Sequence, residues 1–215
     1  VALVASEKLS GRALGDDLAA ANPLMDKGGS CLGAKINLQE MKNGPIRTEL
    51  DPVEGGVRFM FEITELDALL KAKFYAVCIP GSEDIVLKAD AFRVHGVLEF
   101  WITDQGKLRT QVTQSYGEWD NFFIDTGSIP QSVVELFVGD LDEAIADGIA
   151  QAIDEKVPET IDEAMDEFGN DKSVTLLDQE VLISVKPQTV DFSAEGGVIA
   201  IDASIVLPGL VGGEG

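Results

Sequence analysis

The feature that most constrains the fold of this chain is one long helical pattern over residues 129–168. Within it, apolar residues recur at every fourth position: Phe137, Leu141, Ile145, Ile149, Ile153, Val157, Ile161 and Met165. Because an α-helix turns about 100° per residue, a spacing of four moves this stripe by about 40° at each step. The stripe therefore winds most of the way around the helix, and no flat surface can bury it. The pattern predicts a long helix wrapped by a strongly twisted sheet.

Pro158 lies within this predicted helix. A proline has no backbone N–H, so it cannot donate to the carbonyl group of Asp154, four residues earlier, and its ring crowds that carbonyl. We therefore expect the helix to be kinked at this position.

Residues 35–126 follow a period of two, which is typical of strands that are buried on one face. The clearest run has apolar residues at alternate positions: Leu66, Ala68, Leu70, Ala72, Phe74, Ala76 and Cys78. A similar set precedes it, after a turn at residues 51–56: Val57, Phe59, Phe61 and Ile63. Short turns separate these runs, so we expect a meander of long antiparallel strands.

The alternation changes phase near residues 92–96. The apolar positions are odd-numbered from Ile85 to Ala91 and even-numbered from Leu98 to Ile102. A slip of one residue indicates a β-bulge, which bends and twists a strand. After a turn at residues 104–107, the next expected strand has one face made of Leu108, Thr110, Val112, Gln114 and Tyr116.

Both ends of the sequence add smaller elements. Residues 6–21 have helical spacing, with Ser6 as a possible cap and Asn22-Pro23 at the end. Residues 25–33 are glycine-rich, so we expect a loop there. Residues 181–207 return to a period of two with a turn at residues 195–197, which predicts a hairpin. The fold class is therefore α+β, in one domain over residues 1–207 with a linker or tail at residues 208–215, and we interpret the chain as a piece of a longer protein.

Two cysteines, Cys31 and Cys78, are present, without the C-x-x-C spacing of a zinc site or a thioredoxin motif. Either they form a disulfide or they are two buried thiols, and the even count favours the disulfide. A disulfide would indicate an oxidising compartment, the periplasm or the cell exterior.

The charge of the chain is strongly negative. It carries 38 Asp and Glu residues against 16 Lys and Arg residues, a net charge of −22. This field repels nucleic-acid phosphates and anionic lipid head groups, so nucleic acid is not an expected partner. Many carboxylates fall in the predicted long helix, in the pairs Asp142-Glu143, Asp154-Glu155, Asp162-Glu163 and Asp166-Glu167. We expect them to form a solvated face away from the apolar stripe rather than an acid–base site.

Familiar catalytic and metal-binding patterns are missing from the sequence. His95 is the only histidine, which excludes an H-E-x-x-H site, and residues 28–32 (GGSCL) lack the last glycine of a G-x-S-x-G elbow. Asp120, Asn121 and Asp125 lack the spacing of a calcium loop, and we expect a polar turn there. No apolar run approaches the ~20 residues of a membrane-spanning helix. We therefore expect a protein that is not an enzyme, with no cofactor, no metal and no transmembrane segment.

The order of elements resembles the tubular lipid-binding (TULIP) superfamily, which includes bactericidal/permeability-increasing protein and the synaptotagmin-like mitochondrial lipid-binding domains. The resemblance covers roughly residues 35–207 and is one of pattern, without a sharp ligand signature. Its basis is the helix SVVELFVGDLDEAIADGIAQAIDEKVPETIDEAMDEF, preceded by the meander and followed by LLDQEVLISVKPQTVDFSAEGGVIAIDASIVL. It implies a long kinked helix inside a highly curved antiparallel half-barrel. Some bacterial members resemble periplasmic or surface lipoproteins, and we expect a bacterial source.

The resemblance also implies an elongated apolar cavity that binds a phospholipid, a fatty acyl chain or a sterol. A neutral or zwitterionic lipid suits the net charge of −22 best. The expected walls are Phe59, Phe61, Leu70, Phe74, Leu98, Phe100, Phe137, Leu141, Ile145 and Ile149. The alternative is a structural or adhesion domain of a secreted or surface bacterial protein, with the same fold and a filled core. A larger parent chain or a membrane-associated partner is compatible with either.

Overall fold

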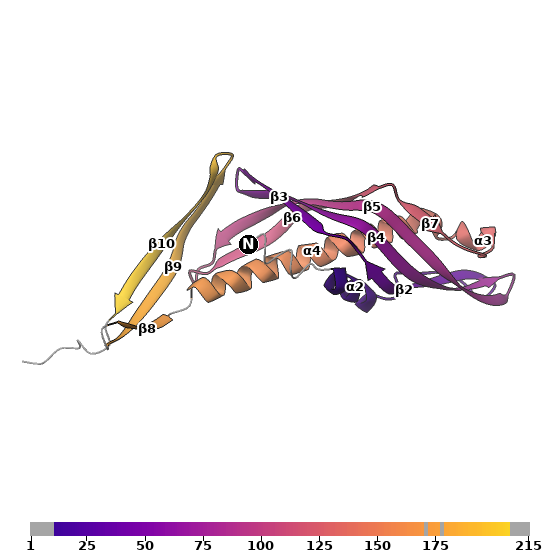
Figure 1. Cartoon of the computed structure of the whole chain (residues 1–215), viewed down its shortest axis with the longest axis horizontal. Helices are drawn as coiled ribbons and strands as arrows, with labels where there is room; N and C mark the ends of the chain where they lie inside the picture. Colours follow the sequence, from indigo (N-terminus) through magenta and orange to yellow (C-terminus); the bar gives the residue numbers. More distant parts are fainter. Residues whose placement is uncertain (1–10, 170–171, 177–178, 207–215) are drawn as a thin grey trace, which may run out of the picture. The chain divides into compact units, whose positions relative to one another are not determined.

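The structure, a computed structural model, describes residues 11–169, 172–176 and 179–206 (Figure 1). Strands predominate, followed by one long helix and a further set of strands, so the α+β prediction is confirmed. The elements are α2 (Gly11–Ala20), β1 (Met25–Gly28), β2 (Leu32–Lys42), β3 (Ile46–Val53), β4 (Gly56–Ala76), β5 (Ile79–Ile102), β6 (Leu108–Asp120), β7 (Phe123–Asp125), α3 (Gln131–Val134), α4 (Val138–Gly169), β8 (Lys172–Leu176), β9 (Gln179–Ser193) and β10 (Gly196–Val206).

The chain divides into two compact units. Unit 1 comprises residues 1–50, 59–96 and 114–156, and unit 2 comprises residues 51–58, 97–113 and 157–215. The boundaries fall inside β3, β4, β5, β6 and α4, so each of these elements contributes to both units. The predicted tail at residues 208–215 lies outside the described residues, and the single-domain assignment stays a prediction.

Unit 1 contains most of a strongly curled, antiparallel half-barrel sheet with strand order β1-β2-β4-β5-β6, to which β3 and β7 add at β4 and β5. The predicted stripe of α4 is buried in this unit: Phe137, Leu141, Ile145, Ile149 and Ile153 are each at most 3% exposed. Burial of these side chains against a curled sheet is what their winding arrangement requires.

The short helix α2 lies between β2 and α4. A Cβ atom at Gly15 would lie 3.2 Å from the Cβ of Met41, and one at Gly148 would lie 2.7 Å from Leu18. Small residues therefore let the helix approach both neighbours closely. The predicted helix at residues 6–21 is confirmed over residues 11–20, whereas Ser6 lies outside the described residues.

The prediction of a loop at residues 25–33 is wrong over its first half. Residues 25–28 form β1, which pairs with β2 from Met25 opposite Ile36 to Gly28 opposite Gly33. Met25 is buried, and Gly28 adopts a φ of 85°, which glycine tolerates without a steric penalty. The glycines therefore make a tight hairpin turn rather than a long loop.

The inner face of the sheet changes phase at three places. In β4 the buried positions change from odd to even at Glu65, which has a φ of 51°. In β5 the change occurs between Ala91 and Phe92, which are both buried, at the start of the segment predicted to contain the bulge. In β6 it occurs at Gln114, with a φ of 56°. Because of this last change Tyr116 is exposed while Leu108 and Thr110 are buried, so the prediction that these residues share one face of the strand is wrong.

Helix α4 continues through Pro158 from Val138 to Gly169, so proline does not end it. The predicted kink stays a prediction. Val157 and Ile161 are buried, and Met165, the last residue of the stripe, is half-buried.

In unit 2, β9 and β10 form the predicted hairpin, and β8 adds a third antiparallel strand that the sequence pattern did not predict. Phe192 of β9 stacks on Phe100 of β5, with ring centroids 4.8 Å apart. The backbone N–H of Gly55 donates to the carbonyl of Phe192 at 3.2 Å. The hairpin is therefore joined to β5 and to the turn before β4.

The carboxylate pairs of α4 are not uniformly solvated, contrary to prediction. In each pair the Asp is partly buried and the Glu that follows it is exposed. In unit 2, Oδ1 of Asp162 accepts from the backbone N–H and the hydroxyl of Thr110, both at 2.9 Å. The Arg109 guanidinium donates to Asp166 at 2.9 and 3.0 Å, and this bond is the main reason why the pKa of Asp166 is lowered. Because successive residues point 100° apart, the Asp faces β6 and the Glu faces water.

The disulfide between Cys31 and Cys78 is confirmed. It joins residues that are 47 positions apart. In the chain-entropy treatment, a loop of this length stabilises the folded state by about 4 kcal/mol.

We predict that Asp162→Ala lowers the free energy of unfolding by about 1–3 kcal/mol, because it leaves the buried backbone N–H of Thr110 without an acceptor and leaves the hydroxyl only the Pro158 carbonyl, at 3.3 Å. Urea denaturation measures this change. Glu167→Ala, at an exposed position of the same helix, is the matched control and should change stability little. Equal effects of the two substitutions would contradict the assignment.

Candidate functional site

Unit 1 contains most of the apolar residues that were expected to line a ligand cavity. Their side chains come from β4 and from α4 and its preceding turn, and all but one are at most 3% exposed: Phe59, Phe61, Leu70, Phe137, Leu141, Ile145 and Ile149 are buried, and Phe74 is half-buried. The rings of Phe59 and Phe61 lie 5.0 Å apart. The structure thus brings these eight residues into one unit.

The two remaining expected residues, Leu98 and Phe100, belong to unit 2. Leu98 is buried, whereas Phe100 is half-buried and stacks on Phe192. Phe74 also has a neighbour of its own, because a Cβ atom at Gly81 would lie 2.4 Å from its ring. The ring of Phe74 therefore covers Gly81 at the beginning of β5.

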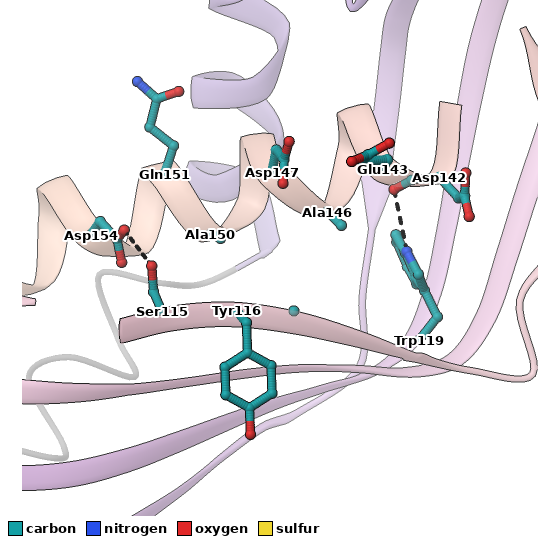
Figure 2. Close-up of a pocket in the computed structure, with 11 residues that line it drawn as sticks. Ser115, Tyr116, Trp119, Asp142, Glu143, Ala146, Asp147, Ala150, Gln151 and Asp154 are labelled. Carbon is teal, nitrogen blue, oxygen red and sulfur yellow. Dashed lines mark hydrogen bonds between the residues drawn. The ribbon is translucent and has the colours of Figure 1, made fainter. Parts of the chain in front are cut away.

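An open groove of about 580 Å³ lies between α4 and β6 in unit 1 (Figure 2). Its volume falls within the ~300–1,000 Å³ that is typical of small-molecule sites. Small residues and two aromatic residues are part of its lining: Tyr116, Gly117 and Trp119 of β6, and Ala146 and Ala150 of α4. Four carboxylates border it: Asp142, Glu143, Asp147 and Asp154.

Two hydrogen bonds connect α4 to β6 on either side of the small residues, as Figure 2 shows. The hydroxyl of Ser115 donates to Oδ2 of Asp154 at 2.6 Å, and the indole Nε1 of Trp119 donates to the backbone carbonyl of Asp142 at 3.3 Å. The indole also packs on Phe92, with ring centroids 4.3 Å apart. Ser115 and Trp119, the two anchors of β6, are thus each held by a hydrogen bond to α4.

Gly117 is required between these two anchors. A Cβ atom at this position would lie 2.4 Å from the ring of Phe92. Since a larger residue cannot fit over that ring, β6 has no side chain at this position of the groove, which Ala146 and Ala150 of α4 also line.

The electrostatics of the groove are dominated by partly buried carboxylates. Burial raises the pKa of Asp154, the hydrogen bond from Ser115 opposes this shift, and the charge of Glu155 adds to it. Oδ1 of Asp154 and Oδ1 of Asp142 are both buried and accept no hydrogen bond. The groove is therefore unfavourable for an anionic group and favourable for a neutral or positively charged one.

Sequence reasoning missed this groove. Its carboxylates were assigned to a solvated face, and its lining from β6 was displaced by the phase change at Gln114. The alternate positions Ser115, Gly117 and Trp119 carry the signal, but without the phase change they fall on the outer face of the strand.

The other polar candidates have structural partners. His95 stacks on Tyr116 at 4.9 Å. Asp120 pairs with Arg93 at 3.3 Å, and Asn121 donates to Asp90 at 2.7 Å, as a polar turn predicts. Among the described residues, no three His, Cys, Asp or Glu side chains are arranged to hold a metal ion. Within the same part of the chain, no helix has the length and apolar character needed to cross a membrane.

We predict that Asp154→Asn is more stable than the wild type at neutral pH and that this difference disappears as the pH falls toward 3.8, the ordinary pKa of Asp. Because burial raises the pKa of Asp154, its contribution to stability is fully present below 3.8 and is lost as the pH rises through the raised value. Thermal unfolding across this pH range measures it. Asp147→Asn, an exposed carboxylate of the same groove, controls for the loss of one charge, and an identical pH dependence of the two variants would contradict the prediction.

Comparisons with known proteins give a likeness of fold. A scan against protein families found no match, and a search of curated sequences found no relative. Among solved structures, the chain is similar to lipopolysaccharide binding protein, with a TM-score of 0.70 and 13% identity, over 95% of this chain and 48% of that one. It also matches latherin at 14% identity and a TM-score of 0.31, over 74% of this chain and 79% of that one.

The chain thus spans about half the length of lipopolysaccharide binding protein. At this level of identity the likeness concerns the fold, and it agrees with the curled sheet, the long helix and their order along the chain. The chain therefore shares the fold of the matched part of lipopolysaccharide binding protein, as the resemblance noted in the sequence led us to expect.

Proposed function

We propose that this chain binds an apolar or amphiphilic small molecule in unit 1, at the groove between α4 and β6 and the apolar interior behind it. The observation that carries the proposal is the floor of the groove, where Gly117, Ala146 and Ala150 leave room beside the buried stripe of α4. An acyl chain or a sterol in contact with these residues gains about 0.8 kcal/mol per buried methylene. A partly inserted chain therefore suffices for micromolar binding after association costs.

The fold supports the same class of ligand. Lipopolysaccharide binding protein, whose name states an amphiphilic lipid ligand, shares the fold of this chain at a TM-score of 0.70. A phospholipid, a fatty acyl chain and a sterol all offer the long apolar surface that fits beside a helix stripe. The proposed role is non-enzymatic binding or transport of such a molecule.

The negative charge of the groove limits which lipid head groups can bind there. Asp142, Asp147 and Asp154 lie at its border, and the buried Oδ1 atoms of Asp142 and Asp154 have no donor. An anionic head group would be repelled there, whereas a hydroxyl or a quaternary amine would supply positive electrostatic potential. We therefore assign the ligand to neutral or zwitterionic lipids.

A filled structural core is the second candidate. It is favoured by the low exposure of the expected cavity residues, of which Phe59, Leu70, Phe137, Leu141 and Ile149 are at most 1% exposed. Side chains buried to this extent can pack against one another as well as against a ligand. The two candidates differ in whether the groove accepts an apolar molecule.

The disulfide supports a location in the periplasm or outside the cell, because cytosolic thiols are kept reduced. The match to about half of a longer structure supports a larger parent chain. The location and the larger parent chain are additions to the proposed function, which does not depend on them.

We predict that Ala150→Trp reduces the affinity for a fluorescent fatty acid at least tenfold, because the indole would occupy the apolar floor of the groove. Fluorescence titration of delipidated protein measures this affinity. A charge at Ile149, which is fully buried, would test folding rather than binding, so a filling substitution is the sharper test.

The matched control is Ala164→Trp, at an exposed position of the same helix, which should leave the affinity unchanged. Circular dichroism and the melting temperature show whether both variants fold. If the wild type shows no saturable binding, or if Ala150→Trp and Ala164→Trp bind the probe equally well, ligand binding in the groove is contradicted and a filled structural core is favoured.

A further inference from the structure

The groove of unit 1 is closed at both ends by hydrogen bonds (Figure 2). At one end the hydroxyl of Ser115 donates to Oδ2 of Asp154, and at the other the indole Nε1 of Trp119 donates to the backbone carbonyl of Asp142. Both bonds join β6 to α4, so each one crosses the groove. The space between the two bonds therefore has a definite length.

The residues of α4 that face β6 recur at every fourth position, one residue after each member of the buried apolar stripe. Most of these positions accept a hydrogen bond from β6: Asp142, Asp154, Pro158, Asp162 and Asp166. Ala146 and Ala150 offer only a methyl group, which cannot bridge the space to β6. The groove thus occupies the interval in which two successive turns of α4 present methyl groups to the strand.

The length of this interval follows from the two elements that border it. On α4, Asp142 and Asp154 are 12 residues apart, which is about 18 Å along the helix axis. On β6, Ser115 and Trp119 are four residues apart, which is about 13 Å along the strand. An extended aliphatic chain advances about 1.3 Å per carbon, because its C–C bonds of about 1.5 Å zigzag. The interval therefore accommodates a chain of about 10 to 14 carbons.

The width of the groove admits one such chain. A volume of about 580 Å³ over a length of about 18 Å leaves a mean cross-section of about 32 Å². Apolar carbons in contact lie about 4.0–4.5 Å apart, so one extended chain takes roughly 20 Å² and two parallel chains roughly 40 Å². Two acyl chains side by side are therefore too wide for the groove, as are the fused rings of a sterol.

The aromatic end of the groove is held by three partners. The Trp119 ring packs on Phe92 and Phe122, with ring centroids 4.3 and 4.8 Å away, and its Nε1 bonds to the Asp142 carbonyl. A ligand chain longer than the interval has to displace the ring from these contacts or leave the groove. The indole therefore acts as a length stop.

We propose that the groove selects its ligand by chain length: it binds an amphiphile with one unbranched aliphatic chain of about 10 to 14 carbons and an uncharged, hydroxyl-bearing head group. Monoacylglycerols and long-chain alcohols belong to this class, whereas diacyl phospholipids and sterols do not. The carboxylates of Asp142 and Asp154 favour a hydroxyl, which can donate to them, over an anionic head group. The inference rests on the proposed function and narrows its ligand class.

The experiment is displacement of the fluorescent fatty acid from the full chain by 1-monoacylglycerols with saturated chains of 8 to 18 carbons, each below the concentration at which it forms micelles. We expect the affinity to increase about fourfold for each added methylene up to about 10 to 14 carbons, and to stop increasing beyond that length. Dioctanoylglycerol should bind no more tightly than monooctanoylglycerol, because its second chain finds no room in the groove.

Two substitutions should move the optimal chain length in opposite directions. Ala146→Leu fills the turn of α4 next to Asp142, about 6 Å of the interval, and should shorten the optimum by about four carbons. Trp119→Ala removes the length stop, so the affinity should continue to increase up to 18 carbons. Ala146→Leu adds its carbons where the groove is open and should keep the fold, so it decides the question if loss of the indole unfolds the protein.

Each of these variants has a matched control elsewhere in the chain. Ala164→Leu is at an exposed position of α4, and Trp101→Ala removes an indole of β5 that is 41% exposed. Both should leave the optimal chain length unchanged. Circular dichroism and the melting temperature show which of the four variants fold.

The outcomes distinguish this inference from the proposed function. A wild type that binds neither the fluorescent fatty acid nor any monoacylglycerol overturns both. A wild type that binds the fatty acid but shows no limit of chain length, or that binds dioctanoylglycerol more tightly than monooctanoylglycerol, overturns the chain-length inference alone. An optimum that stays unchanged in folded Ala146→Leu does the same.

Discussion

The rest of the structure depends on how the apolar stripe of α4 is buried. A spacing of four residues turns the stripe around the helix, so a sheet can cover it only if the sheet is curled. The changes of phase in β4, β5 and β6 provide this curvature, because each one lets a long strand bend while its inner face stays apolar. The helix sequence and the irregularities of the strands are therefore two parts of one packing solution.

The winding of the stripe also decides which carboxylates of α4 contact the sheet. As the stripe turns, the Asp of each carboxylate pair comes to face β6 while the Glu stays in water. Asp162 and Asp166 then anchor α4 to β6 in unit 2, and Asp154 does so in unit 1. Where the neighbouring residues are small, at Gly117, Ala146 and Ala150, the two elements leave a groove. The proposed ligand site is thus a product of the packing of α4 against the edge of the sheet.

The sequence predicted those features that follow from one periodic pattern. The stripe of α4, the alternation in β4, the hairpin of β9 and β10 and the disulfide needed only local spacing or a count of two cysteines. It could not predict the face of Tyr116, because a positive φ at Gln114 is not encoded by any glycine. It also could not assign Asp154, whose burial depends on Ser115, 39 residues away. Which of the expected apolar residues contact a ligand is likewise a matter of space between elements and not of their pattern.

The most direct test of the central claim is mass spectrometry of an organic extract from the full chain, purified without detergent. If α4 and the curled sheet hold an apolar ligand, the extract contains a phospholipid, a fatty acid or a sterol in near-stoichiometric amount, with a neutral or zwitterionic head group preferred by the carboxylates at the groove. Extraction of Ala150→Trp in parallel should give much less of it. An extract of the wild type that holds no more lipid than a buffer blank would contradict the account and favour a core filled by its own side chains.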